Sequence, residues 1–119
     1  MMITKKTNEA IDKELARMEL REMFAKQDRP TVYTVLRHVS QSGMSRDISL
    51  FIVEDNRLRN ITYKVAIALG EKPKDKNGRR VIRVNGCGMD MGFHLVYSLS
   101  SVLYTNEDRA GYKLSHEWA

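Results

Sequence analysis

The sequence predicts an α+β fold in the order helix, strand, strand, helix, strand, helix, with a possible final edge strand. Two long segments have helical periodicity, the segments between them are rich in β-branched residues, and Gly or Pro marks the junctions. The 119 residues fit one domain, divided into an N-terminal helix at 1–30 and a compact α+β part at 31–119. Hydrophobic residues make up 42% and charged residues 29%, which excludes wholesale disorder.

The first predicted helix covers residues 8–28 and stops before Pro30. Its apolar residues fall on two sides rather than on one stripe. One side holds Ile11, Leu15 and Met18, and the other holds Leu20, Met23 and Phe24. A helix with two apolar sides often has two neighbours. We therefore expect either that one side meets the core and the other a second subunit, or that the chain wraps around the helix.

Two strands are predicted next, at residues 31–39 and 47–53, because both segments are rich in β-branched and aromatic side chains. The polar loop 40–46 between them has the character of a hairpin connection, and residues 54–57 form a second turn. The alternation of Ile48, Leu50 and Ile52 places them on one face of the second strand.

The second half of the chain predicts a short helix at about 62–69, a strand at 81–84 and a long helix at 91–104. A glycine-rich turn at 85–88 separates that strand from that helix. The tail, 111–118, is expected to add an edge strand to the sheet.

The formal net charge of +5 is concentrated in residues 61–90, which hold seven basic and three acidic side chains. The densest run is 72–80, where Pro73 and Asn77-Gly78 are turn signals. Such a loop either touches phosphates or is simply solvated, and the run contains no aromatic side chain on which a base would stack. The positive net charge excludes an acidic DNA mimic and permits an anionic partner.

The first candidate site is the segment 37–46, which concentrates hydrogen-bond donors around one glycine. Its candidate ligand-binding residues are Arg37, His38, Ser40, Ser42, Gly43, Ser45 and Arg46. Gly43 allows a positive φ that can turn successive N–H groups toward one point, and Arg donors match phosphate geometry. The alternative is a polar surface hairpin in which Arg37 and Arg46 pair with nearby acids such as Asp47.

The second candidate site is the glycine-rich segment that opens the last helix, with candidate residues Gly86, Cys87, Gly88, Asp90 and His94. A glycine-rich turn between a strand and a helix lets a ligand approach backbone amides. The segment matches neither a phosphate-loop pattern nor G-x-G-x-x-G. Asp90 stands four residues before His94 and either orients its imidazole, binds a cation or ribose hydroxyl, or merely caps the helix. The glycines alternatively serve tight helix–strand packing.

Cys87 precedes a helix N-terminus, where a thiolate is stabilised, so a Cys87–His94 nucleophile pair is one hypothesis. The alternative is a small buried apolar residue. A single Cys excludes an intrachain disulfide framework and suits a reducing compartment. A metal site would need Cys87, His38, His94 or His116 from distant segments, so no metal and no cofactor are predicted.

The motifs Arg37-His-Val-Ser-Gln-Ser-Gly-Met-Ser-Arg-Asp-Ile-Ser49 and Gly86-Cys-Gly-Met-Asp-Met-Gly-Phe-His-Leu-Val-Tyr97 resemble a group of small uncharacterised proteins encoded by tailed phages and prophages. The resemblance covers roughly residues 31–118. It implies the cytoplasm of a bacterial host and a role in host takeover, replication or evasion of defence. It implies little about the chemistry that the protein performs.

The leading hypothesis is a non-enzymatic phage accessory protein that binds an anionic ligand, either a nucleic acid or a signalling nucleotide. The first segment would contact phosphates, and Asp90 and His94 would contact the base or sugar. One alternative is an inhibitor of a host defence nuclease, such as a CRISPR effector, that docks through helix 8–28 and methionine-rich surface. A second is a small Cys/His enzyme. No membrane association is expected, and helix 8–28 is the candidate surface for a homo-oligomer.

Overall fold

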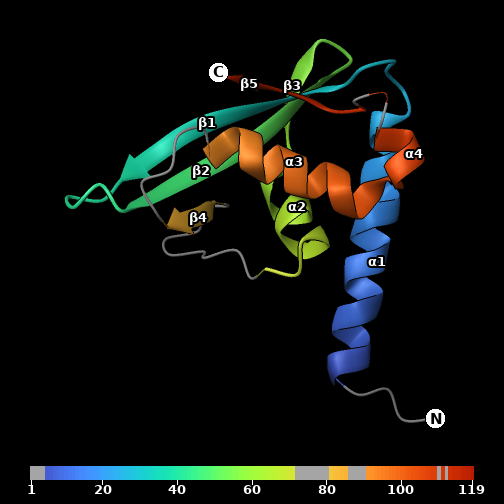
Figure 1. The fold of residues 1–119 in the computed structure, drawn as a ribbon, viewed down its shortest axis with the longest axis horizontal. Helices are drawn as coiled ribbons and strands as arrows, with labels where there is room; N and C mark the ends of the chain where they lie inside the picture. The colour runs from blue at the N-terminus through green and yellow to red at the C-terminus, as the bar shows by residue number, and fades with distance from the viewer. Residues whose placement is uncertain (1–4, 72–80, 86–90, 110, 112) are drawn as a thin grey trace.

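The computed structural model describes residues 5–71, 81–85, 91–109, 111 and 113–119, and it confirms an α+β fold (Figure 1). In chain order the elements are α1 (Lys5–Phe24), β1 (Thr31–Val39), β2 (Ser45–Glu54), β3 (Arg57–Asn60), α2 (Thr62–Ala68), β4 (Ile82–Asn85), α3 (Met91–Leu103), α4 (Asn106–Arg109) and β5 (Ser115–Trp118).

The five-stranded sheet is organised around β2. Strand β1 pairs with it antiparallel on one edge, and β5 pairs parallel to β1 beyond that. The other edge of β2 is shared, because β3 pairs with its second half and β4 with its first half. Between these two strands, Leu50 N–H donates to the Thr62 hydroxyl at 2.8 Å, and Leu50 O accepts from Ile61 N–H at 2.9 Å. The backbone of β2 is therefore engaged along most of both edges.

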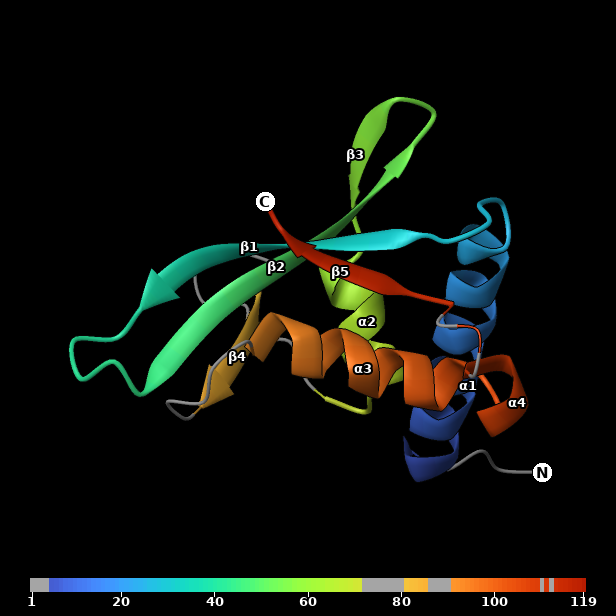
Figure 2. The same ribbon diagram turned by 45° about the horizontal axis from the view of Figure 1, so that its top comes forward.

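The four described helices lie on one side of β1 and β2 (Figure 2). The side chains of Ile48, Leu50 and Ile52 alternate along β2 and are buried toward the helices, as the sequence predicts. They join one hydrophobic core with α1, α2 and α3, whose largest fully buried members include Leu20, Phe24, Val65 and Leu99. Since α1 contributes to this core, it is part of the same folding unit as the sheet.

Helix α1 has the two apolar sides that the sequence predicts. Leu20, Met23 and Phe24 are buried in the core, whereas Ile11, Leu15 and Met18 are exposed. The helix begins earlier than predicted and ends at Phe24 rather than near residue 28. Residues 25–29 instead form a turn that redirects the chain toward the buried Pro30, and the Gln27 side chain donates to the Val53 carbonyl at 2.7 Å.

The predicted turn at 54–57 is a two-residue hairpin connection followed by a strand that the sequence analysis did not expect. Asp55 and Asn56 both have positive φ, 51° and 64°, and Glu54 pairs with Arg57 across the turn. Two left-handed residues match the twist of an antiparallel pair. Strand β3 is short and its side chains are exposed, which explains why it lacks the alternation that marks a buried strand. Helix α4 was also not predicted, whereas the final edge strand is present as β5.

Candidate functional site

Arg37 lies at a β-bulge in β1. Leu36 lies opposite Ile48 and His38 lies opposite Asp47, so Arg37 has no partner residue on β2. The extra residue shifts the alternation of β1 by one position. Arg37 Nε donates to Ser49 Oγ at 3.3 Å, and the guanidinium carbon lies 5.9 Å from the centre of the Phe51 ring. Arg37 follows Tyr33 and Val35 in the alternation of β1, so it lies on the side of the sheet that faces away from the helices, and the bulge places His38, opposite Asp47, on that side as well.

We call this side the open sheet face and define it by Tyr33, Val35, Arg37, Ser49 and Phe51. Tyr33 lies opposite Phe51 and Val35 opposite Ser49, so each pair shares a face. Their neighbours Ile48 and Leu50 point to the helices, and no described helix covers the opposite side (Figure 2). Tyr33, Val35 and Phe51 are half-buried, and Ser49 is only 2% exposed. The open sheet face therefore presents two aromatic rings beside a guanidinium.

An ion pair extends the open sheet face onto β4. Arg83 lies opposite Asp47, its Nε donates to Asp47 Oδ1 at 2.8 Å and its Nη2 to Oδ2 at 3.2 Å. This forked geometry is the strong form of an Arg–carboxylate contact. The hydrogen bond and charge of Asp47 raise the pKa of Arg83 above its ordinary value. The sequence offers Asp47 as a partner for Arg37 or Arg46, but it gives no sign of Arg83, which reaches Asp47 only through the β2–β4 pairing.

The backbone N–H donors at the tip of the hairpin are bonded to acceptors within the hairpin itself. Ser40 Oγ accepts from Ser45 N–H at 3.0 Å and shares a hydrogen bond with Ser42 Oγ, which accepts from Met44 N–H at 3.4 Å. Gly43 N–H donates to Ser40 O at 2.9 Å, and Gly43 has the positive φ that was predicted, 74°. The amides of residues 43, 44 and 45 therefore all have partners inside the hairpin. An anion cradle at this tip would have to break these bonds.

Arg46 points away from Arg37. It lies two residues before Ile48 on β2, so alternation places it on the helix side of the sheet. Its Nε is buried and has no hydrogen-bond partner among the described residues. The sequence predicts that Arg37 and Arg46 bind one ligand together. The structure instead places them on opposite sides of the sheet.

Most of the second predicted segment lies outside the described residues, including Gly86, Cys87, Gly88 and Asp90. The residue before it, Asn85, pairs with Ser45, whose hydroxyl donates to Asn85 Oδ1 at 3.1 Å. The first predicted segment therefore pairs with the end of β4, the strand that precedes the second segment. His94 is exposed in the first turn of α3, with its ring edge-on to Phe93 at 6.0 Å.

The start of α3 packs tightly against the sheet at Gly92. A Cβ at this position would lie 2.8 Å from His116 Cε1 and 3.1 Å from Thr34 Oγ1. The side chain of Thr34 is fully buried beside it. At Gly92 the glycine therefore serves close helix–strand packing, one of the two roles that the sequence left open.

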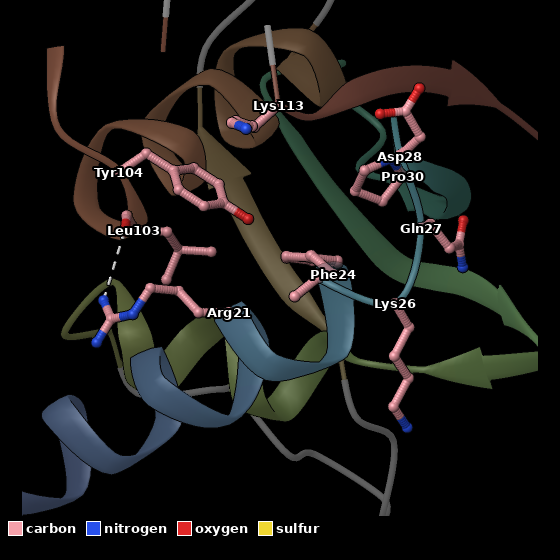
Figure 3. A pocket seen from close by; sticks show the side chains of 10 residues that line it. Arg21, Phe24, Lys26, Gln27, Asp28, Pro30, Leu103, Tyr104 and Lys113 are labelled. Atoms are coloured by element: carbon pink, nitrogen blue, oxygen red, sulfur yellow. Dashed lines mark hydrogen bonds between the residues drawn. The ribbon is translucent and has the colours of Figure 1, made fainter. Parts of the chain in front are cut away.

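A separate hollow of about 600 Å³ opens beside the C-terminal end of α1, and none of the predicted site residues lines it (Figure 3). Its lining includes Arg21, Phe24, Tyr104 and Lys113. Arg21 is already engaged, because Nη2 donates to Glu14 at 3.1 Å and Nη1 to the Leu103 carbonyl at 3.5 Å. Lys26 also lines the hollow, and its side chain extends away from Tyr104 and Lys113 (Figure 3). This arrangement gives no convergent set of donors.

Comparison with known protein families, with curated proteins and with solved structures finds no match to this chain. Within the described part of the chain, no group of three or more His, Cys, Asp or Glu side chains is arranged to hold a metal ion. No described helix has both the length and the apolar character needed to cross a membrane. The open sheet face is the candidate site that remains.

Proposed function

We propose that the protein binds single-stranded nucleic acid on the open sheet face, without catalysing a reaction. The observation that carries this proposal is the placement of the Arg37 guanidinium over the Phe51 ring, with Tyr33 at the position opposite Phe51 in the strand pairing. A guanidinium contacts a phosphate with forked donors, and an aromatic ring stacks on a base. The two contacts together are what a nucleotide in a flexible strand requires.

The shape of the face favours a polymer over a small signalling nucleotide. Small ligands are usually held in concave sites where several donors converge. Here the candidate residues spread over β1, β2 and β4, from Tyr33 to Arg83. The hairpin amides that would have closed around a phosphate are used internally. A strand lying across the sheet would contact the rings and the guanidinium in succession.

The resemblance to phage-encoded proteins supplies a setting for this activity. In an infected bacterial cell, an accessory protein that coats or sequesters single strands would act in host takeover or in counter-defence. The same resemblance is our reason for proposing that the protein acts in the bacterial cytoplasm. Binding to a host protein is a second candidate function, and it is favoured by the exposed apolar side of α1.

The test is fluorescence anisotropy with a labelled oligo(dT) of about 15 nucleotides, measured over a range of salt. We expect Phe51→Leu to weaken binding by about tenfold, because base stacking on an aromatic ring contributes about 1–3 kcal/mol. Arg37→Gln should weaken binding and reduce the slope of log K against log salt by about 0.7, the value for one phosphate contact on a single strand.

Phe93→Leu is the matched control. Phe93 is 52% exposed on α3 and stacks on Tyr97 at 6.4 Å, so the variant removes an exposed ring that is not part of the open sheet face. It should bind the oligonucleotide like the unmodified protein. Equal binding by Phe51→Leu, Arg37→Gln and the unmodified protein would refute the proposal. So would a larger thermal stabilisation by mononucleotides than by the oligonucleotide.

A further inference from the structure

The outer side of α1 is an exposed apolar surface on a helix that is otherwise part of the core. Ile11, Leu15 and Met18 are 44%, 50% and 47% exposed. They follow each other at spacings of four and three residues, so they form one continuous stripe along the helix. We call them the α1 stripe. We propose that this stripe, with the groove beside it, binds a basic amphipathic helix of a partner protein.

The groove runs between α1 and α2. One hollow of about 360 Å³ is lined by Leu15 and Ala16 of α1 and by Tyr63 and Ile67 of α2, with Asp12, Glu19 and Lys64 at its sides. A second hollow of about 400 Å³ continues it and shares Asp12 and Ile67. The floor is mostly apolar and the sides are mostly charged. This is the form in which a groove accepts the apolar side of a helix.

The charge around the stripe is acidic, in contrast to the chain as a whole, which carries +5. Five exposed carboxylates of α1 lie within about two turns of Leu15, namely Glu9, Asp12, Glu14, Glu19 and Glu22. Four cations lie in the same region, one fewer than the carboxylates: Arg21 pairs with Glu14, Lys64 pairs with Glu19, Arg17 donates to the Ala68 carbonyl at 2.9 Å, and Lys13 lines the second hollow. Lys64 holds the pKa of the Glu19 carboxyl below its ordinary value, so this acid is ionised at neutral pH. A ligand rich in phosphate is therefore unsuited to this face.

A second copy of the chain also fits poorly. Asp12 and Glu19 flank the stripe on one side at a spacing of seven residues, and Glu14 flanks it on the other together with Arg21, with which it pairs. Two antiparallel copies would set the Asp12–Glu19 flank against itself, and two parallel copies would set Glu14 near Glu19 of the other copy. Both arrangements oppose like charges. A helix with Lys or Arg beside its apolar residues complements both the stripe and its flanks.

The probe for this proposal is a pair of synthetic amphipathic peptides of 18 residues. Both carry the same leucine face, and the flanking positions are Lys in one peptide and Glu in the other. We expect the Lys peptide to bind at least tenfold tighter than the Glu peptide in isothermal titration calorimetry. Leu15→Gln should weaken the Lys peptide about tenfold, and the double variant Asp12→Asn with Glu19→Gln should remove most of the preference between the peptides.

Leu58→Gln is the matched control, because Leu58 is 67% exposed on β3, and it should bind the Lys peptide unchanged. Thermal melts establish that every variant is folded. Equal affinity for the two peptides, or unchanged binding by Leu15→Gln, would overturn the proposal. A dimer in sedimentation velocity that Leu15→Gln dissociates would also overturn it, in favour of a second copy. None of these outcomes alters oligonucleotide binding by the open sheet face, so the two proposals fail separately.

Discussion

The open sheet face and the α1 stripe both expose apolar side chains, yet they carry opposite charges. Phe51 on the sheet has a guanidinium, that of Arg37, beside its ring. Leu15 on the helix is flanked by the carboxylates of Asp12 and Glu19. Apolar area alone does not distinguish a nucleic-acid surface from a protein-binding surface. The charge at the edge differs in sign between the two surfaces, and the two proposals rest on that difference; the net charge of +5 describes neither surface.

The two surfaces also differ in how their side chains are held. Arg37 is tied to Ser49, and Phe51 is half-buried between two neighbouring strands. The members of the α1 stripe are close to half exposed. A preorganised surface loses less conformational entropy when it binds. A ligand of the sheet face would therefore meet side chains that are already held in place, whereas a partner of the α1 stripe would have to order the side chains that it contacts.

The largest expected effect is a difference in unfolding free energy between the same Leu→Ala substitution on the two sides of α1. Leu20 is fully buried and Leu15 is half exposed on the same helix. Leu20→Ala should lower the free energy of unfolding by about 2–5 kcal/mol, because it removes buried methyl groups and leaves a cavity. Leu15→Ala should change it by no more than about 0.5 kcal/mol, as for other surface positions. Urea denaturation of both variants measures the difference.

A loss of more than 2 kcal/mol in Leu15→Ala would show that the α1 stripe is covered within the chain. The contrast between the two surfaces would then fail, since the stripe would belong to the core. Met18→Ala is a second check at the next position of the stripe and should be as mild as Leu15→Ala.

A smaller effect is expected at the hairpin tip that joins the two central strands. Ser40→Ala removes the acceptor for Ser45 N–H, which should cost about 0.5–1.5 kcal/mol in unfolding free energy. Gly43→Ala meets no atom within 4 Å but places a Cβ at φ 74°, which should cost about 1–2 kcal/mol. Both are measured by denaturation, and oligonucleotide affinity should stay unchanged. Weaker oligonucleotide binding without a loss of stability would show that the hairpin tip is part of the binding site.

The sequence predicted the two sides of α1 because the helical period of 3.6 residues separates Leu15 from Leu20 whatever surrounds the helix. It identified Arg37 by composition, and alternation from Tyr33 and Val35 gives its direction; the bulge instead reverses the face of the side chains after it, beginning with His38. The alternation in β2 contained the signal for Ser49 and Phe51, which lie out of phase with the buried Ile48. Arg83 had no local signal, because its contact with Asp47 joins residues 36 apart.

The ion pair on the sheet gives a test with a more modest effect. Asp47→Asn removes the carboxylate that binds Arg83 and leaves that guanidinium available to a phosphate. We expect the slope of log K against log salt for oligo(dT) to steepen by up to about 0.7, the contribution of one added phosphate contact. Anisotropy titrations at several salt concentrations measure it. An unchanged slope would mean that the strand does not reach β4, and the open sheet face would be confined to β1 and β2.

The smallest effect concerns the acidic edge of the α1 stripe. The hydrogen bond and then the charge of Lys64 hold the pKa of Glu19 below its ordinary value of 4.5. A lowered pKa means that the pair stabilises the fold fully above pH 4.5 and that this contribution disappears as the pH falls through the lowered value. Lys64→Met should return the Glu19 pKa toward 4.5, as measured by carboxyl NMR titration. Identical titrations of Glu19 in both proteins would show that Lys64 does not tune this acid, and the stripe would then owe its charge to carboxylates acting independently of α2.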